Sequence, residues 1–262
     1  MAYVIAIANQ KGGVAKTTTV VSLGGALVQS GAEVLAIDMD PQADLSLALG
    51  ADPAQVRHSI FEVLMESANL LGVSRETTIP GLDLVPSNRE MDLAERFLSI
   101  RQNYQFILRN ALQILTQSQA YDYILIDCPP AIGAITTNAV FAANLLVIPT
   151  QAEFFSIYAL RNMLNFVKRV RTQGNPNLTY RILITMKDRR NKIHNVLTDQ
   201  LFSNFSGALF STIIETDTKL RESSIVGLPI THFASKSRSS LQYHTLAQEL
   251  FEYVKEGISQ PA

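Results

Sequence analysis

Short apolar runs recur along the chain, and most are followed by a longer stretch in which apolar positions return with helical spacing. The runs are rich in Ile, Leu and Val, which is typical of strands that are buried on both faces of a parallel sheet. Seven runs predict strands: YVIAIAN from Tyr3, EVLAIDMD from Glu33, LDLVPS from Leu82, YDYILIDCPP from Tyr121, NLLVIPT from Asn144, YRILITM from Tyr180 and STIIE from Ser211.

The stretches between these runs predict helices. Five are expected, at Thr17–Ser30, Glu90–Gln117, Ser156–Gln173, Ile193–Phe205 and Arg238–Gly257. Strands that alternate with helices indicate a doubly wound α/β fold, with a single, mostly parallel sheet that carries helices on both faces. The polar segment QGNPNLT predicts an exposed turn. No repeat or low-complexity linker interrupts the alternation of strands and helices. We therefore expect residues 1–262 to form a single domain.

Composition narrows the class of protein. Hydrophobic residues make up 47% of the 262 residues and charged residues 17%, which is the composition of a globular protein. The formal net charge of −1 means that any surface for nucleic acid must be local. Cys128 is the single cysteine, which excludes an intrachain disulfide. With neither a signal peptide nor an apolar run long enough to span a bilayer, we expect a soluble, cytoplasmic protein.

The segment KGGVAKTT follows the first predicted strand and opens the first predicted helix. This context is typical of a phosphate-binding loop, in which glycines let backbone N–H groups and the helix N-terminus surround phosphate oxygens. Lys16 is expected to reach the β- and γ-phosphates and the Thr17 hydroxyl to bind Mg²⁺. The residues expected to hold the nucleotide here are Lys11, Gly12, Gly13, Val14, Ala15, Lys16, Thr17 and Thr18. The alternative is a glycine-containing turn that binds nothing.

Ala15 departs from the common pattern G-x-x-x-x-G-K-[ST], which has glycine at this position. If the loop requires a positive φ there, alanine costs on the order of 1 kcal/mol relative to glycine.

Acidic residues follow two of the predicted strands. The second strand ends with Asp38 and Asp40, and the fourth ends with Asp127. The carboxyl ends of parallel strands border the crevice in which such sheets bind ligands. Asp127 is expected to hold Mg²⁺ directly or through water, and Asp40 to orient the attacking water; the candidate metal ligands are thus Thr17, Asp40 and Asp127. Aspartates that only terminate strands and cap helices are the alternative.

Taken together, KGGVAKTTT, DMDPQ and YDYILIDCPP resemble the deviant Walker A ATPases of the ParA/MinD class, and the ParA (Soj-like) branch most closely. The resemblance extends over nearly the whole chain. It continues through LVPSN, PPAIGAITTNAVFAANLLVIPTQAEFFSIYAL, LITM, RESSIVGLPI and SKSRSSLQYHTLAQEL. Ala15 is the departure from the commonest pattern, and it bears on the rate of hydrolysis more than on nucleotide binding.

The resemblance implies a function for each part of the motif set. It implies an ATPase that binds ATP or ADP with Mg²⁺, forms an ATP-bound sandwich dimer and hydrolyses ATP slowly without a partner. Lys11 is similar to the signature lysine that crosses to the partner subunit's nucleotide; the alternative is a solvent-exposed lysine at the loop mouth. Met186 and Pro229 are the candidates for contact with adenine. The catalytic residues implied are Lys11, Lys16 and Asp40.

Three classes of function compete. A redox protein of the nitrogenase iron-protein type needs two cluster cysteines in each subunit, and this chain has only Cys128. A MinD-like membrane-cycling ATPase needs a basic amphipathic C-terminal helix. The tail LAQELFEYVKEGISQPA instead carries three glutamates and one lysine, and its apolar residues are typical of a helix face packed on the core. The third class is a DNA-associated positioning ATPase.

The DNA-associated reading requires a local basic surface. Candidate clusters are KRVR, KDRRNK, KLR and SKSR, all in the second half of the chain. The resemblance favours Arg221, Lys236 and Arg238 as contacts to DNA phosphates, without readout of base sequence. It also implies a ParB-like stimulating partner and a place on the nucleoid. The chain begins at its first strand, so we expect no N-terminal helix-turn-helix domain. The sequence does not name the cargo.

Overall fold

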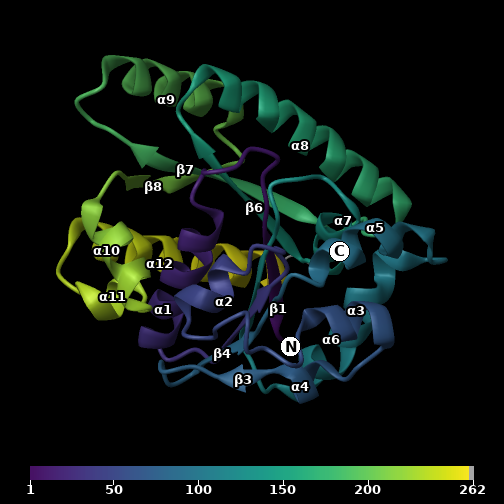
Figure 1. The fold of residues 1–262 in the computed structure, drawn as a ribbon. Helices are drawn as coiled ribbons and strands as arrows, with labels where there is room; N and C mark the ends of the chain where they lie inside the picture. Colours follow the sequence, from purple (N-terminus) through teal and green to yellow (C-terminus); the bar gives the residue numbers. More distant parts are fainter. Residues whose placement is uncertain (260–262) are drawn as a thin grey trace.

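Strands of one sheet run through the centre of the molecule in the computed structural model, which describes residues 1–259 (Figure 1). Within these residues the sheet has eight strands in the order β3-β4-β2-β5-β1-β6-β7-β8, and only the β3–β4 pair is antiparallel. The strands are β1 (Tyr3–Ile7), β2 (Val34–Asp38), β3 (Arg75–Glu76), β4 (Leu82–Val85), β5 (Tyr123–Asp127), β6 (Leu145–Gln151), β7 (Thr179–Lys187) and β8 (Leu209–Glu215). The predicted doubly wound, mostly parallel α/β fold is confirmed.

All seven predicted strands form. The eighth, β3, contains two exposed residues and escaped prediction because so short a strand has no apolar pattern. The helices are α1 (Lys16–Gln29), α2 (Asp44–Ala48), α3 (Ile60–Glu66), α4 (Leu70–Val73), α5 (Met91–Phe97), α6 (Ile107–Ser118), α7 (Ala134–Ala142), α8 (Phe154–Gln173), α9 (Lys192–Phe205), α10 (Thr218–Val226), α11 (Ile230–Phe233) and α12 (Arg238–Ser259).

The helix predicted over Glu90–Gln117 is wrong as a single element. The chain forms α5, two short 3₁₀ turns at Leu98–Ile100 and Tyr104–Phe106, and then α6. Asn103 lies between the turns with φ 56°, in the left-handed region that asparagine tolerates better than most residues. Arg101 donates a hydrogen bond to the carbonyl oxygen of Leu64 at 2.7 Å, which holds the bend against α3. The apolar period alone did not reveal this interruption.

Buried side chains form a hydrophobic cluster on each face of the sheet. One cluster contains side chains from α3 to α9, and the other contains side chains from α1, α2, α11 and α12. Helices α1 and α12 come from opposite ends of the sequence and pack side by side (Figure 1). Parallel strands covered on both faces account for the near-continuous apolar runs in the sequence.

The sheet register brings three of the loops at the carboxyl ends of strands together. Ile7 at the end of β1 is level with Asp127 at the end of β5, and Asp38 at the end of β2 is level with the same aspartate. The loop that follows β1 therefore begins beside both acidic strand ends. This edge of the sheet is where a doubly wound fold places its ligand site.

Candidate functional site

The segment KGGVAKTT joins β1 to α1, and α1 begins at Lys16. A cleft of about 590 Å³ opens beside it, lined by Gly12, Gly13, Ala15, Lys16, Thr17 and Thr18 from this loop. The Lys16 side chain is 7% exposed, so its ammonium group is nearly enclosed by protein. Val14 faces the other way: its side chain is buried, and its carbonyl oxygen accepts a hydrogen bond from the Thr185 hydroxyl at 3.1 Å. Val14 therefore fixes the loop to β7.

Ala15 has the left-handed backbone that the sequence pattern reserves for glycine. Its φ is 65° and its ψ is 36°, and it is the N-cap of α1. Gly13 has a similar φ of 69° two residues earlier. For an L-residue with a Cβ atom, this conformation costs on the order of 1 kcal/mol. The condition set out from the sequence, that position 15 needs a positive φ, is met.

Replacement of Ala15 by glycine should relieve this strain. We expect Ala15→Gly to raise nucleotide affinity or turnover by up to about tenfold, equivalent to about 1.4 kcal/mol. Fluorescence titration with an ADP analogue and a phosphate-release assay measure the two quantities. Ala26→Gly in the middle of α1 is the control, because there glycine can only weaken the helix. Unchanged affinity and turnover in Ala15→Gly would show that the loop holds this backbone without strain.

Thr17 lines the cleft and meets Asp127, which is buried behind it. The Thr17 hydroxyl donates a hydrogen bond to Oδ2 of Asp127 at 2.6 Å, whereas Oδ1 of Asp127 is buried with no partner among the described residues. Asp38 is fully buried beside it. Burial, with the negative charge of Asp38, raises the pKa of the Asp127 carboxyl well above its usual range. A cation at this point would satisfy the orphaned oxygen and offset the repulsion of two buried carboxylates.

These donors fit Mg²⁺ in particular. Magnesium prefers oxygen ligands and is usually held by one or two protein groups together with phosphate oxygens and water. Thr17 and Asp127 supply hydroxyl and carboxylate oxygens next to the phosphate loop. No group of three or more His, Cys, Asp or Glu side chains within residues 1–259 could hold a metal by itself. The geometry therefore suits a magnesium ion that arrives with a nucleotide.

Asp38 and Asp40 differ in their surroundings, because Asp38 is buried and Asp40 lines the cleft. Asp38 lies beneath the surface and accepts hydrogen bonds from the backbone and hydroxyl of Ser46, at 2.8 and 2.7 Å, and from the backbone of Asp40. Its burial raises the pKa of its carboxyl to about 7. Asp40 lines the cleft, and partial burial raises the pKa of its carboxyl too. Asp38 is thus a structural anchor, whereas Asp40 faces the ligand space.

The side chain of Lys11 leaves the loop in another direction from that of Lys16. Its ammonium nitrogen contacts Glu153 Oε2 at 2.5 Å, Gln151 Oε1 at 3.0 Å and Ser156 Oγ at 3.2 Å, all at the end of β6 or the start of α8. Lys11 is not among the residues that line the cleft. Sequence reasoning missed Glu153, because one carboxylate before an apolar helix has no pattern that marks it.

The far end of the cleft is built by β7, β8 and α10. Met186, Thr216, Leu220 and Arg221 line it, so Met186 lies where adenine contact was predicted. Pro229 does not line it. Pro229 is buried against Gly25 of α1, where an added Cβ would come within 2.4 Å of the proline Cβ. Arg221, predicted as a DNA contact, is exposed and lines the cleft on the side of α10 that faces it.

The other two predicted DNA contacts lie beside a separate groove between β8 and α12. Arg189, Lys236 and Arg238 line one end of it. Lys236 is exposed, whereas Arg238 forms an ion pair with Glu215 at 3.0 Å. Arg221 therefore lines the cleft while Lys236 and Arg238 line the groove, although the family resemblance had grouped the three together.

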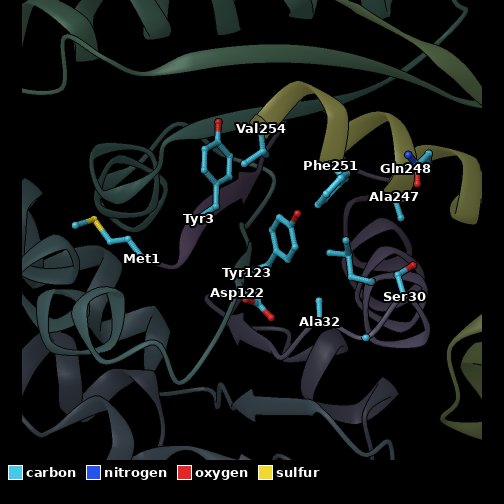
Figure 2. Close-up of a pocket in the computed structure, with 12 residues that line it drawn as sticks. Met1, Tyr3, Ser30, Ala32, Asp122, Tyr123, Ala247, Gln248, Phe251 and Val254 are labelled. Carbon is cyan, nitrogen blue, oxygen red and sulfur yellow. The ribbon is translucent and has the colours of Figure 1, made fainter. Parts of the chain in front are cut away.

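Another cavity lies at the opposite ends of the strands (Figure 2). It has a volume of about 440 Å³ and lies between the start of β1, the start of β5 and the last turns of α1 and α12. Tyr3, Tyr123 and Phe251 surround it. The phosphate loop contributes none of its lining residues, so the candidate site is the cleft beside Lys16.

Comparison with known proteins agrees with this site. The family described as "AAA domain" matches residues 2–180. The chain is 36% identical to the chromosome partitioning protein ParA of Caulobacter vibrioides over 248 residues, which cover 94% of this chain and 93% of that protein. It is 35% identical to the sporulation initiation inhibitor protein Soj of Bacillus subtilis, over 95% of this chain and 98% of that one.

Solved structures show the same fold. Cobyrinic acid a,c-diamide synthase from Mycobacterium smegmatis with bound ADP and magnesium superposes with a TM-score of 0.86 and 31% identity, covering 100% of this chain and 99% of that one. The cell division ATPase MinD of Pyrococcus furiosus has a TM-score of 0.79 at 23% identity, over 97% and 100% of the two chains. These structures and the site define a P-loop ATPase. The chain belongs to the ParA/MinD class, in the ParA (Soj-like) branch of partitioning ATPases.

Proposed function

We propose that this chain is an ATPase that dimerises on ATP, binds DNA without sequence preference in that state, and positions DNA or another cargo. A ParB-like or other partner stimulates hydrolysis and so releases the dimer from the nucleoid. The observation that carries the proposal is the divergence of two lysines in one loop. The side chain of Lys16 lies inside the cleft, whereas the side chain of Lys11 lies outside it and contacts the turn that begins α8.

The divergence supports a dimer because each lysine has a separate task. Lys16 supplies charge to the nucleotide of its own subunit. We propose that Lys11 leaves Glu153 and reaches the nucleotide of a second subunit, as an arginine finger does in other phosphoryl-transfer enzymes. The family relationship to ParA and Soj supports this assignment.

Nucleotide and metal have defined places in the proposal. The loop from Gly12 to Thr18 surrounds the phosphates, Thr17 and Asp127 hold Mg²⁺, and Met186 meets the base. When bound, the metal neutralises charge that builds up on the phosphate oxygens. Asp40 accepts a hydrogen bond from the attacking water and orients it. The strained Ala15 is consistent with a slow basal rate.

The membrane-cycling alternative has less support. It requires α12 to offer an apolar face to lipid. Leu246, Leu250 and Val254 on that helix are 1%, 1% and 8% exposed and pack in the core. Glu249 accepts hydrogen bonds from the backbone N–H groups of Ser211 and Thr212 at the edge of the sheet. Within residues 1–259, no helix is both long and apolar enough to cross a bilayer.

DNA binding is the part of the proposal to test first. With ATP, we expect binding to two unrelated duplexes with equal affinity, and log affinity should fall linearly with log salt. If each subunit makes about three phosphate contacts, a dimer makes about six, and the slope should be about −5. Lys236→Ala removes one contact per subunit, so it should reduce the slope by about 2 for both duplexes.

Fluorescence anisotropy across a salt series measures the slope. Arg57→Ala, which removes one positive charge from exposed surface outside the candidate basic clusters, is the control and should leave the slope unchanged. Arg221→Ala is unsuitable, because Arg221 lines the cleft. Wild-type protein that binds no duplex at low salt would remove DNA as the surface on which the protein acts. Binding to only one duplex would show base readout.

A further inference from the structure

The carboxylate of Glu215 lies between two arginines from distant parts of the chain. Glu215 ends β8 and is 5% exposed. One of its oxygens forms an ion pair with Arg189, in the loop after β7, and the other lies 3.0 Å from Nη1 of Arg238, the first residue of α12. We call these three residues the Glu215 network. Burial of a carboxylate costs free energy unless paired cations and hydrogen bonds compensate its lost hydration.

The Glu215 network is joined to the nucleotide cleft by a short chain of hydrogen bonds. Nη2 of Arg238 donates to the carbonyl oxygen of Thr216 at 2.7 Å. The Thr216 hydroxyl donates to the carbonyl oxygen of Met186 at 3.0 Å. Met186, Glu215 and Thr216 all line the cleft. Loss of the Glu215 network would therefore loosen the wall of the cleft that these residues form.

Met186 needs this support because its backbone is strained. Its φ is 55°, in the left-handed region that a residue with a long side chain rarely occupies. Such a conformation persists only where surrounding contacts determine it. Two contacts to Met186 do so here: the Thr216 hydroxyl on its carbonyl oxygen, and the Gln151 side-chain amide on its sulfur at 3.0 Å.

The position of this wall identifies the part of the ligand that it meets. The phosphates belong at the loop from Gly12 to Thr18, where the cleft begins. Thr185 of β7 touches that loop through Val14, and the wall formed by Met186 and Thr216 continues from there to the ends of β7 and β8, two and three strands from β1 in the sheet order. A ligand anchored by its phosphates would place its ribose and base against this wall.

We propose that Glu215, acting through Arg189 and Arg238, is a positioning residue that holds the base-side wall of the nucleotide cleft. Arg238, although half-exposed, thereby serves as a structural cation rather than primarily as a DNA contact. The inference rests on the proposed nucleotide binding at this cleft. It predicts that substitutions in the Glu215 network lower the affinity for ligands that carry a base and leave the affinity for ligands made only of phosphate unchanged.

Calorimetric titration with two probes tests this directly. ADP reaches both ends of the cleft, whereas tripolyphosphate reaches only the phosphate loop. We expect Glu215→Gln and Arg238→Ala each to weaken ADP binding about tenfold. Arg238→Ala takes a cation away from the buried Glu215 carboxylate, and Glu215→Gln removes the charge that holds both arginines in place. Tripolyphosphate affinity should stay within about twofold in both. The variant that combines Glu215→Gln with Arg238→Ala should also bind ADP only about tenfold more weakly than wild type, because both substitutions break the same network.

A matched pair of variants provides the control. Arg189 and Arg190 are neighbours in one loop, but Arg190 is paired with the exposed Asp188 and not with Glu215. Arg189→Ala should lower the affinity for ADP, and Arg190→Ala should leave it unchanged. Thr216→Val removes only the hydroxyl that holds Met186, so it tests the proposal even if a charge variant fails to fold. It should weaken ADP about threefold.

The outcomes separate this inference from the function on which it rests. ADP affinity within about twofold of wild type in Glu215→Gln, Arg238→Ala and Thr216→Val would overturn the inference while leaving nucleotide binding intact. An equal fall in the affinities for ADP and tripolyphosphate would overturn the inference as well, because the substitutions would then have disturbed the phosphate loop. Wild-type protein that binds neither probe would overturn the proposed nucleotide site, and the inference with it.

Discussion

Lys16→Ala should abolish nucleotide binding, with the dissociation constant for ADP rising by at least about 100-fold, or about 2.7 kcal/mol. The Lys16 ammonium is nearly enclosed and lies in the loop whose backbone faces the cleft. At a site of low effective dielectric constant, its attraction to phosphate is several times stronger than in water. Removal of this cation leaves the phosphates facing Asp40 and Asp127 without compensation. Titration with a fluorescent ADP analogue measures the loss.

The second lysine of the loop is the control for the first. Lys11→Ala removes the same charge five residues earlier, but its side chain contacts Glu153 outside the cleft. We therefore expect ADP affinity in Lys11→Ala to stay within about threefold of wild type. Normal ADP binding by Lys16→Ala would exclude the phosphate-loop interpretation. A large loss in Lys11→Ala would show that Lys11 serves its own nucleotide.

Lys11→Ala should instead reduce ATP turnover by about a thousandfold or more, the range found for charge supplied by a second subunit. The reason is that Lys11 would reach the phosphates only in a dimer, where it offsets charge that develops during transfer. Phosphate release under saturating ATP measures the rate. A rate within about tenfold of wild type would contradict a catalytic role for this lysine.

A mixing experiment decides whether Lys11 acts across the dimer. Asp40→Ala should also lack turnover, because it has no group to orient water, but it retains Lys11. In an equal mixture, about half of the dimers contain one subunit of each kind, and each has one complete site, so turnover should return to about a quarter of wild type. A mixture as inactive as its components would indicate that Lys11 and Asp40 act within one subunit.

Local signals in the sequence were sufficient for the strands and for the phosphate loop. Seven apolar runs gave seven strands, because a strand buried on both faces must be apolar at nearly every position. KGGVAKTT gave the loop, because few residue types allow backbone N–H groups to surround phosphate. The interruption near Asn103 and the short helices α2, α3, α4, α7, α10 and α11 escaped prediction, because tertiary contacts decide such elements more than periodicity does.

The amino-acid sequence was enough to predict the class of fold, the loop, and the acidic residues Asp38, Asp40 and Asp127 at the strand ends. Each is a short-range pattern with a direct physical cause. The directions in which side chains point from those positions depend on tertiary packing. It separated Lys11 from Lys16, placed Arg221 on the cleft and Pro229 against α1, and joined Arg238 to Glu215. These relations depend on the packing of distant segments, such as Pro229 against Gly25 of α1, which no local pattern records.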